Sequence, residues 1–191
     1  NSGTLTLGSS NITIGAGCGG NQSISGFSTT GSITMSKTSG TARFTGNVGT
    51  GALVMNGTGG TLNLGSGFTH TFSSVTLTNG TLNGATSTMN VSGNWSGAGA
   101  NFIAGTSTVN LNGGNQTISS TSTAPSPTFY NLSCTGTGTK TFSNSFTVSS
   151  VMTINGPIAQ LANGTTSTVN MLRLGTSYQV AGTYGSTAAG N

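Results

Sequence analysis

The sequence repeats short patterns at intervals of about 20 residues, which constrains the fold more than any other feature. Three segments share the order Ser-Thr-apolar-Asn-apolar, and their starts lie 20 and then 60 positions apart: 87–91, 107–111 and 167–171. The order Gly-Thr-Leu-Asn occurs at 60–63 and again at 80–83. A fixed period of this length is the signature of folds built from stacked repeats.

Within the repeats, apolar residues alternate with Thr, Ser or Asn. Examples are Ile12-Thr13-Ile14 and Val75-Thr76-Leu77. Alternation with period two predicts short β-strands, and the Gly, Asn and Ser residues between them predict turns. We expect Trp95 and the phenylalanines to stack in the core, and Asn and Thr to form hydrogen-bonded ladders. Only the segment 157–164 has the Pro and Gly placement of a helical turn.

Two all-β folds fit this pattern. In a parallel β-solenoid (β-helix), each coil of about 20 residues contributes short strands that stack on the next coil. In an antiparallel β-sandwich, here one completed by a donated strand, turns recur every 8–12 residues. Motifs repeated at multiples of 20 favour the solenoid, because sandwich strands need not resemble one another. We therefore predict one all-β domain, residues 1–191, of nine or ten coils.

The chain has no Asp or Glu, and four Lys or Arg residues give it a net charge of +4. The absence of carboxylates removes glycosidase pairs, aspartic dyads, the third member of a Ser-His-Asp triad and carboxylate cages for calcium. We therefore expect no enzyme, and no catalytic, metal or cofactor-binding residues. His70, beside a predicted strand, is interpreted as an exposed residue at a strand end.

The distribution of the basic residues indicates whether the chain has a nucleic-acid partner. Lys37, Arg43, Lys140 and Arg173 lie far apart in the sequence, whereas nucleic-acid binding normally requires clustered basic residues. The sequence contains no run of 18 apolar residues, which a membrane-spanning helix would need. Asn-X-Ser/Thr triplets such as Asn11-Ile12-Thr13 are frequent, so glycans remain compatible with an exported chain. We expect neither a nucleic-acid partner nor a membrane-spanning segment.

Cys18 and Cys134 are the two cysteines, and they form a candidate disulfide, within one chain or between chains. They are separated by nearly six repeats, or roughly 29 Å in an ideal solenoid with about 4.8 Å between coils. A disulfide joins Cα atoms that are only about 6 Å apart. Either the solenoid is interrupted, or the thiols are free, or they pair between subunits.

Part of the chain resembles a known kind of repeat. The order Gly93-Asn94-Trp95, then 101–113, 115–119 and 128–132, is similar to Gly/Thr/Asn-rich repeats of large secreted bacterial surface proteins. Those repeats are β-helical and akin to adhesin or autotransporter passengers. The segment 160–187 resembles the closing coil of such arrays. Together the matches cover about half of the chain, and they imply architecture and an extracellular or cell-surface location rather than an activity.

In those arrays the closing coil is usually followed by one more strand, with a Gly-Thr-Leu-Thr-like run. The run Gly3-Thr4-Leu5-Thr6-Leu7 at the start of this chain has that character. We therefore hypothesise that the N-terminal strand of one subunit completes the C-terminal end of the next by β-augmentation. The candidate subunit contacts are Gly3, Thr4, Leu5, Thr6, Leu7, Tyr184 and Gly185. The alternative is that 3–7 is simply the first coil.

The leading functional hypothesis is a structural subunit of an extracellular filament or surface array. Solenoid ends expose strand edges, which natural proteins usually block with caps, charges or prolines. The sequence shows no capping helix and almost no charge near either terminus, so we expect head-to-tail association with copies of itself. The alternative is an adhesin stalk or an ice- or glycan-binding solenoid that presents rows of threonine.

Overall fold

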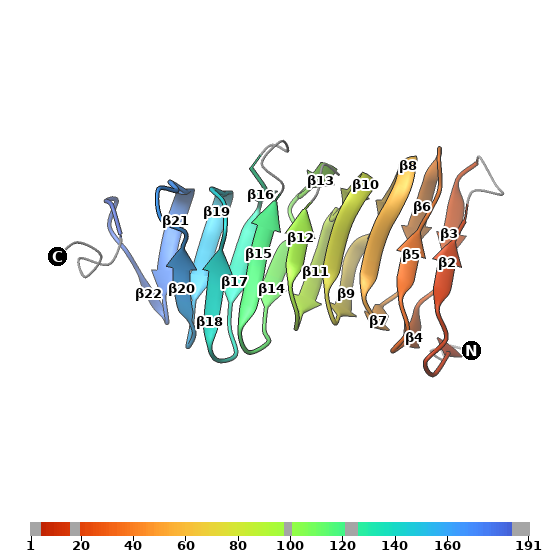
Figure 1. Cartoon of the computed structure of the whole chain (residues 1–191), viewed down its shortest axis with the longest axis horizontal. Coiled ribbons are helices and arrows are strands. Elements are labelled where there is room, and N and C mark those ends of the chain that lie inside the picture. The colour runs from red at the N-terminus through yellow and green to blue at the C-terminus, as the bar shows by residue number, and fades with distance from the viewer. Residues whose placement is uncertain (1–4, 16–19, 98–100, 121–125, 185–191) are drawn as a thin grey trace.

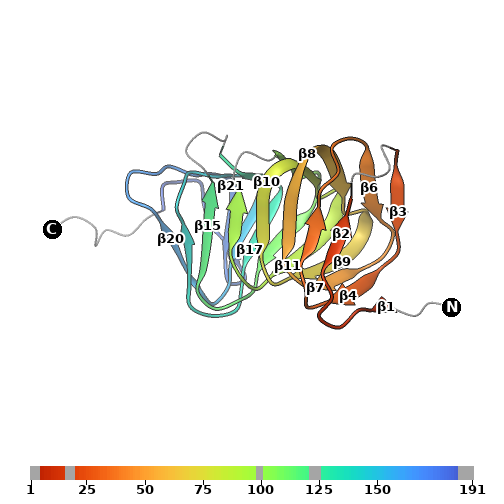
Figure 2. The same ribbon diagram turned by 45° about the vertical axis from the view of Figure 1, so that its right-hand side comes forward.

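The computed structural model describes residues 5–15, 20–97, 101–120 and 126–184. Every regular element in these residues is a β-strand, and the strands wind into a parallel solenoid (Figure 1). The N- and C-terminal ends lie at opposite ends of its long axis (Figures 1 and 2). The predicted solenoid is therefore confirmed, and the sandwich alternative is excluded because successive coils pair in parallel.

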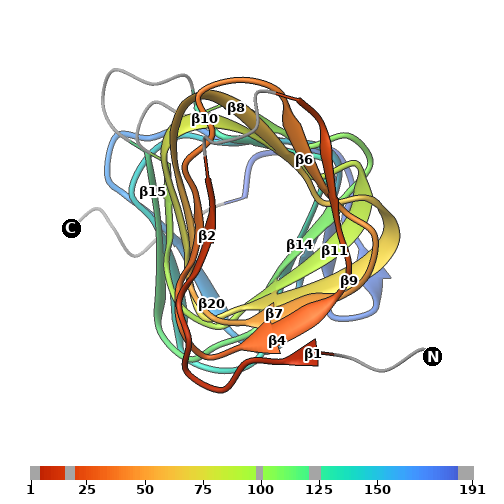
Figure 3. The ribbon, with the colours of Figure 1, turned by 90° about the vertical axis from the view of Figure 1, so that its right-hand side faces the viewer.

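Viewed along its axis, the solenoid is a closed tube whose wall has three faces (Figure 3). Face 1 comprises β2 (Ile12–Ile14), β5 (Ile33–Met35), the first part of β8 (Leu53–Asn63), the first part of β10 (Val75–Asn83), β12 (Trp95–Gly97), β15 (Gln116–Ser120), β18 (Thr139–Phe142) and β20 (Ile158–Leu161). Face 2 comprises β3 (Gln22–Ile24), β6 (Thr41–Phe44), the second parts of β8 and β10, and β13 (Asn101–Ile103).

Face 3 runs along the whole described solenoid. It comprises β1 (Leu5–Thr6), β4 (Phe27–Thr29), β7 (Val48–Thr50), β9 (Ser66–Phe72), β11 (Thr86–Val91), β14 (Thr108–Leu111), β17 (Asn131–Cys134), β19 (Thr147–Ile154) and β21 (Thr168–Leu174). The short strand β16 (Thr128–Phe129) pairs with the start of β19. At the C-terminal end, β22 (Ser177–Tyr178) pairs with β21 and forms the one antiparallel pair among the described strands.

The strand register stacks apolar residues in continuous inward rows. On face 1 one row contains Ile12, Ile33, Leu53, Val75, Trp95, Ile118, Phe142 and Leu161. Because side chains alternate across a strand, each inward residue lies two positions from the next, and Thr, Ser or Asn between them face outward. Trp95 also contacts the rings of Phe102 and Phe129, at centroid distances of 5.1 and 5.6 Å. Trp95, Phe129 and Phe142 are buried, as predicted for core residues, but the ring contacts of Trp95 are edge-to-face rather than stacked.

The coils vary in length, which accounts for the difference from the predicted number. Face 1 has eight strands, so the described chain makes about eight turns rather than nine or ten. From Ile33 to Leu53 the chain advances 20 residues, but from Ile118 to Phe142 it advances 24. The segment 157–164 was expected to form a helical turn and instead contains β20, because its backbone pairs with β18.

Asparagines support the corners between faces. Asn47 accepts a hydrogen bond through Oδ1 from the backbone N–H of Thr69 in the next coil, at 2.9 Å. Asn94 accepts one from Thr117 in the same way, at 2.8 Å. Further pairs of this kind are Asn11 with Ser32, Asn21 with Thr41, and Asn115 with Thr139. The side-chain oxygen thus takes the place of a backbone acceptor at these solvent-exposed corners and joins each coil to the next.

Glycine is required where one corner stacks closely on another. A Cβ at Gly113 would lie 1.8 Å from the carbonyl oxygen of Ser92 in the preceding coil. The next residue, Gly114, has open space around its Cβ direction. The high glycine content therefore includes positions fixed by coil stacking as well as ordinary turn positions.

This contrast gives a matched pair of substitutions. Gly113→Ala should lower the free energy of unfolding by about 2–3 kcal/mol, because backbone must shift to admit the methyl group. Gly114→Ala should leave it unchanged or raise it by up to about 1 kcal/mol. Urea denaturation followed by circular dichroism measures both. Equal effects of the two substitutions would show that coil stacking does not select glycine at 113.

Candidate functional site

The two ends of the solenoid expose strand edges and apolar residues that are covered in its interior. At the N-terminal end, β1, β2 and β3 pair with β4, β5 and β6 on one side only among the described residues. Leu5 is in register with Phe27, yet Leu5 is 61% exposed and Phe27 is 5% exposed. Among the described residues, the inward row that contains Leu5 and Phe27 therefore begins with an uncovered leucine.

The C-terminal end is open in the same sense. Leu161 follows Phe142 in the inward row of face 1, and exposure rises from 1% at Phe142 to 41% at Leu161. Leu174 continues an inward row of face 3 and is 42% exposed. Ile158 and Met171 add further exposed apolar surface at this end. One more coil stacked here would cover the same rows that are buried throughout the interior.

A short segment after β21 folds back over part of this end. We call residues 175–182 the strap. Its strand β22 places Tyr178 opposite Arg173 and Ser177 opposite Leu174, and the N–H of Gln179 donates to the carbonyl of Leu172 at 2.9 Å. The Arg173 guanidinium lies 5.7 Å from the centroid of the Tyr178 ring. The strap thus occupies the backbone edge of β21 from Leu172 to Leu174.

The structure separates the residues predicted to make subunit contacts into two groups. Leu5, Thr6 and Leu7 lie at the N-terminal end, where β1 pairs with β4 and the Leu7 N–H donates to Ser28. Tyr184 lies beyond the strap, is partly exposed, and donates its hydroxyl to the carbonyl of Val180. Gly3, Thr4 and Gly185 lie outside the described residues. The predicted contacts are therefore placed at opposite ends of one solenoid.

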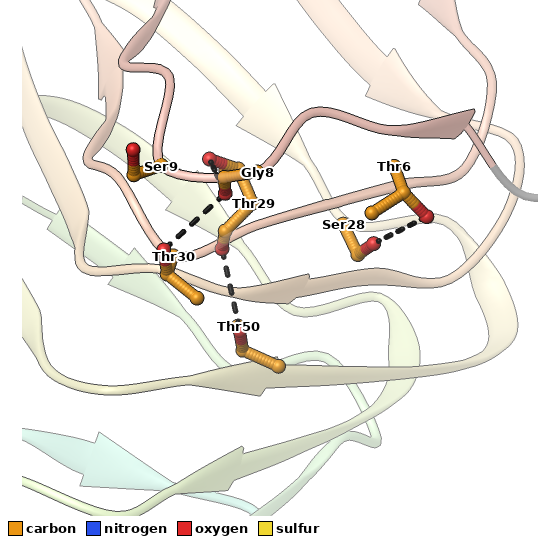
Figure 4. Close-up of a pocket in the computed structure, with 7 residues that line it drawn as sticks. All are labelled: Thr6, Gly8, Ser9, Ser28, Thr29, Thr30 and Thr50. Atoms are coloured by element: carbon orange, nitrogen blue, oxygen red, sulfur yellow. Dashed lines mark hydrogen bonds between the residues drawn. The ribbon is translucent and has the colours of Figure 1, made fainter.

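A hydroxyl-lined depression of about 340 Å³ lies beside β1 (Figure 4). Three of its hydroxyl groups donate within the protein: Ser28 to Thr6, Thr30 to the carbonyl of Gly8, and Thr50 to the carbonyl of Thr29. Since these donors are engaged, the depression is a corner between the first coils, and we do not treat it as a ligand site.

Cys134 is a buried free thiol in the inward row of face 3. Burial raises its pKa to about 12, an effect that the positive charge of Lys140 opposes. Such a thiol is a weak nucleophile because the thiolate is the reactive form. Cys18, its candidate disulfide partner, lies outside the described residues.

Two of the four cations are buried. Lys140 donates through Nζ to the carbonyls of Gly113 and Gly114, each at 2.6 Å, and to Thr137 at 3.1 Å. Burial lowers the pKa of Lys140, and Cys134 opposes that shift. Lys37 is also buried and donates to the carbonyl of Gly20 at 3.1 Å. These ammonium groups satisfy corner carbonyls, so they join coils rather than form a basic surface.

His70 is buried in the middle of β9, so its interpretation as an exposed strand-end residue was wrong. Its side chain points to the same side of the strand as Phe72. The two rings stack, with 6.0 Å between their centroids and 10° between their planes. The Val48 N–H donates to Nδ1 at 3.2 Å, which leaves Nε2 protonated to donate to the Leu64 carbonyl at 2.8 Å. The fold therefore requires the neutral imidazole.

Burial lowers the pKa of His70 below its ordinary value of 6.5, against the opposing effect of the hydrogen bond to Leu64. Below pH 6.5 the unfolded chain takes up a proton that the folded chain resists, so stability should fall as the pH falls. The chain has no Asp or Glu, and His70 is its one histidine, so in the unfolded chain His70 is the side chain whose ordinary pKa lies between pH 4.5 and 7.

We therefore expect the free energy of unfolding to decrease below pH 6.5, by up to about 1.4 kcal/mol per pH unit. His70→Gln should be less stable at pH 7 by about 1–3 kcal/mol, because it loses the ring contacts with Phe44 and Phe72, and it should lose the pH dependence that His70 contributes. Denaturation at several pH values between 4.5 and 7 checks this. A flat wild-type profile would contradict the assignment of a neutral buried imidazole.

In the described residues, no helix is long and apolar enough to span a membrane. No three His, Cys, Asp or Glu side chains gather as a metal site in that same part of the chain. No family model matches the sequence, and neither curated proteins nor solved structures gave a match. The exposed apolar residues of the described solenoid include Leu5 at its N-terminal end and Leu161 and Leu174 at its C-terminal end.

Proposed function

We propose that the protein is a non-enzymatic structural subunit of an extracellular filament or surface array, assembled head to tail through its open strand edges. The proposal rests on one observation: in an inward row, the residues of the interior coils are buried, whereas the residue on the last coil is exposed. Phe142 is covered by the next coil, whereas Leu161 is not. A second copy stacked coaxially would supply both the backbone partners and the apolar cover.

The charge distribution supports association between copies. Like charges oppose self-association, and natural edge strands often carry charges that prevent it. This chain has no acidic residue, and Lys37 and Lys140 are buried. Coaxial head-to-tail contacts add each copy along the same axis and therefore do not close into a ring, so they produce an open-ended polymer. The extracellular location is proposed from the resemblance of the sequence to exported β-helical repeats.

A charge at the N-terminal end tests the proposal. The wild-type protein should form unbranched fibres in electron micrographs, with an axial repeat of roughly 40 Å set by the stacking of coils about 4.8 Å apart. Leu5→Lys should reduce the sedimented fraction at least tenfold, because the lysine would have to be desolvated at the contact. Its melting temperature should be unchanged, since Leu5 is exposed in one copy.

Thr117→Lys is the matched control, because it adds the same charge at an exposed site in the middle of the solenoid. It should polymerise like the wild type. A wild-type protein that stays monomeric at high concentration would refute the filament proposal, and equal polymerisation of Leu5→Lys would exclude the N-terminal end as the contact.

A binding module is the second candidate, and one observation favours it. On face 3, Thr69, Thr88 and Thr108 are in direct register on successive coils, which makes a short row of hydroxyl groups. The row ends at Asn131, which is in register with Thr108. An ice-binding role predicts thermal hysteresis in solutions of the monomer, and its absence would eliminate that role.

A further inference from the structure

We infer that β1 of a second copy docks on the edge of β21 by replacing the strap, so that the strap is a displaceable cap. This inference rests on the proposed function and deepens it by naming the strand, the register and the contact that must open. The occupant is a second copy of this chain, bound through Leu5, Thr6 and Leu7.

The register follows from the rows of face 3. One inward row begins with Leu5 and Phe27, and the described row on later coils ends with Met89, Val109, Leu132, Met152 and Leu172. A coil added in the same register places Leu5 of the second copy beside Leu172. Thr6 then lies beside Arg173, and Leu7 lies beside Leu174.

The strap departs from the winding of the chain. Elsewhere the chain passes from face 3 to the next strand of face 1 within a few residues, as from Phe27 to Ile33. After Leu174 it instead reverses at Gly175, whose φ is +59°, and pairs antiparallel with β21. The strap therefore fills the position on face 3 where a parallel strand of a further coil would lie.

The strap satisfies the backbone of β21 but covers its apolar row poorly. Partners in an antiparallel pair share one side of the sheet, so the strap places Ser177 beside Leu174 and Gln179 beside Leu172. Leu174 remains 42% exposed with the strap in place. β1 would place two leucines at these positions instead, which removes more apolar surface from water.

The attachment of the strap is also small. It consists of a two-residue ladder, the hydrogen bond from Gln179 to Leu172, and the contact of Arg173 with Tyr178. Tyr178 is 59% exposed, so its contact with Arg173 buries less than half of the residue. A weakly held polar cap on an apolar edge delays association until another copy displaces it.

Engineered disulfides test the register. In a Cys18→Ser background, Thr6→Cys with Arg173→Cys should give chains of covalently linked subunits on oxidation of the polymer, seen as a ladder on a non-reducing gel. Thr6→Cys with Met171→Cys is the control, because residue 171 is two positions away on the same side of the strand, or about 6.6 Å. Cys134 is retained in both, since it is buried.

A second disulfide tests the strap. Arg173 and Tyr178 face each other next to the hydrogen-bonded pair Leu172–Gln179, so they form a non-hydrogen-bonded pair with a Cα separation of about 4.5 Å, within disulfide range. Arg173→Cys with Tyr178→Cys should stay monomeric when oxidised and polymerise when reduced. Arg173→Cys with Tyr178→Ser loses the same side chains without the lock and should polymerise under both conditions.

The outcomes separate the inference from the proposed function. A wild-type protein without polymers refutes the function, and the inference with it. Polymers that crosslink through residue 171 as efficiently as through residue 173 refute the register and leave the function standing. Oxidised, locked protein that polymerises like the reduced form refutes the displaceable cap alone.

Discussion

The structure depends on hydrogen bonding between successive coils in a fixed register. Strands in the interior of the solenoid form backbone bonds with the strands one turn earlier and one turn later. Residues paired in this register therefore point to the same side of the wall. Ile33, Leu53 and Val75 illustrate this, since all three face inward at one position of face 1. A shift by one residue would turn the whole inward row outward, and the burial of that row therefore holds the register.

The same constraint explains the polar residues in the core. Lys140 lies two positions before Phe142, and His70 lies two positions before Phe72, so both must point inward. Burial of a polar group is costly unless it is hydrogen-bonded. Each of these side chains is hydrogen-bonded to backbone groups. Lys140 binds the Gly113 carbonyl and His70 accepts from the Val48 N–H, so both side chains connect one coil to the preceding one.

The sequence predicted the solenoid because its period of about 20 residues and its two-residue alternation are both local signals. The alternation also placed His70, Lys37 and Lys140 on the inward side, since each lies two positions from a Phe or Met that faces the core. The prediction that His70 is exposed relied on its residue type and ignored this alternation. The segment 157–164 was misassigned because its Pro and Gly placement is a local preference, which pairing with β18 overrides. The strap had no signal in the repeat, since it breaks the winding.

The burial of two lysines also reduces the number of sites at which proteases can cut the chain. Enzymes that cut after lysine or arginine need an accessible side chain and a flexible backbone, and Lys37 and Lys140 offer neither inside the tube. Arg43 is exposed but lies within a paired strand, and Arg173 lies on the edge of β21 under the strap. The described surface therefore offers few positions to enzymes of this specificity.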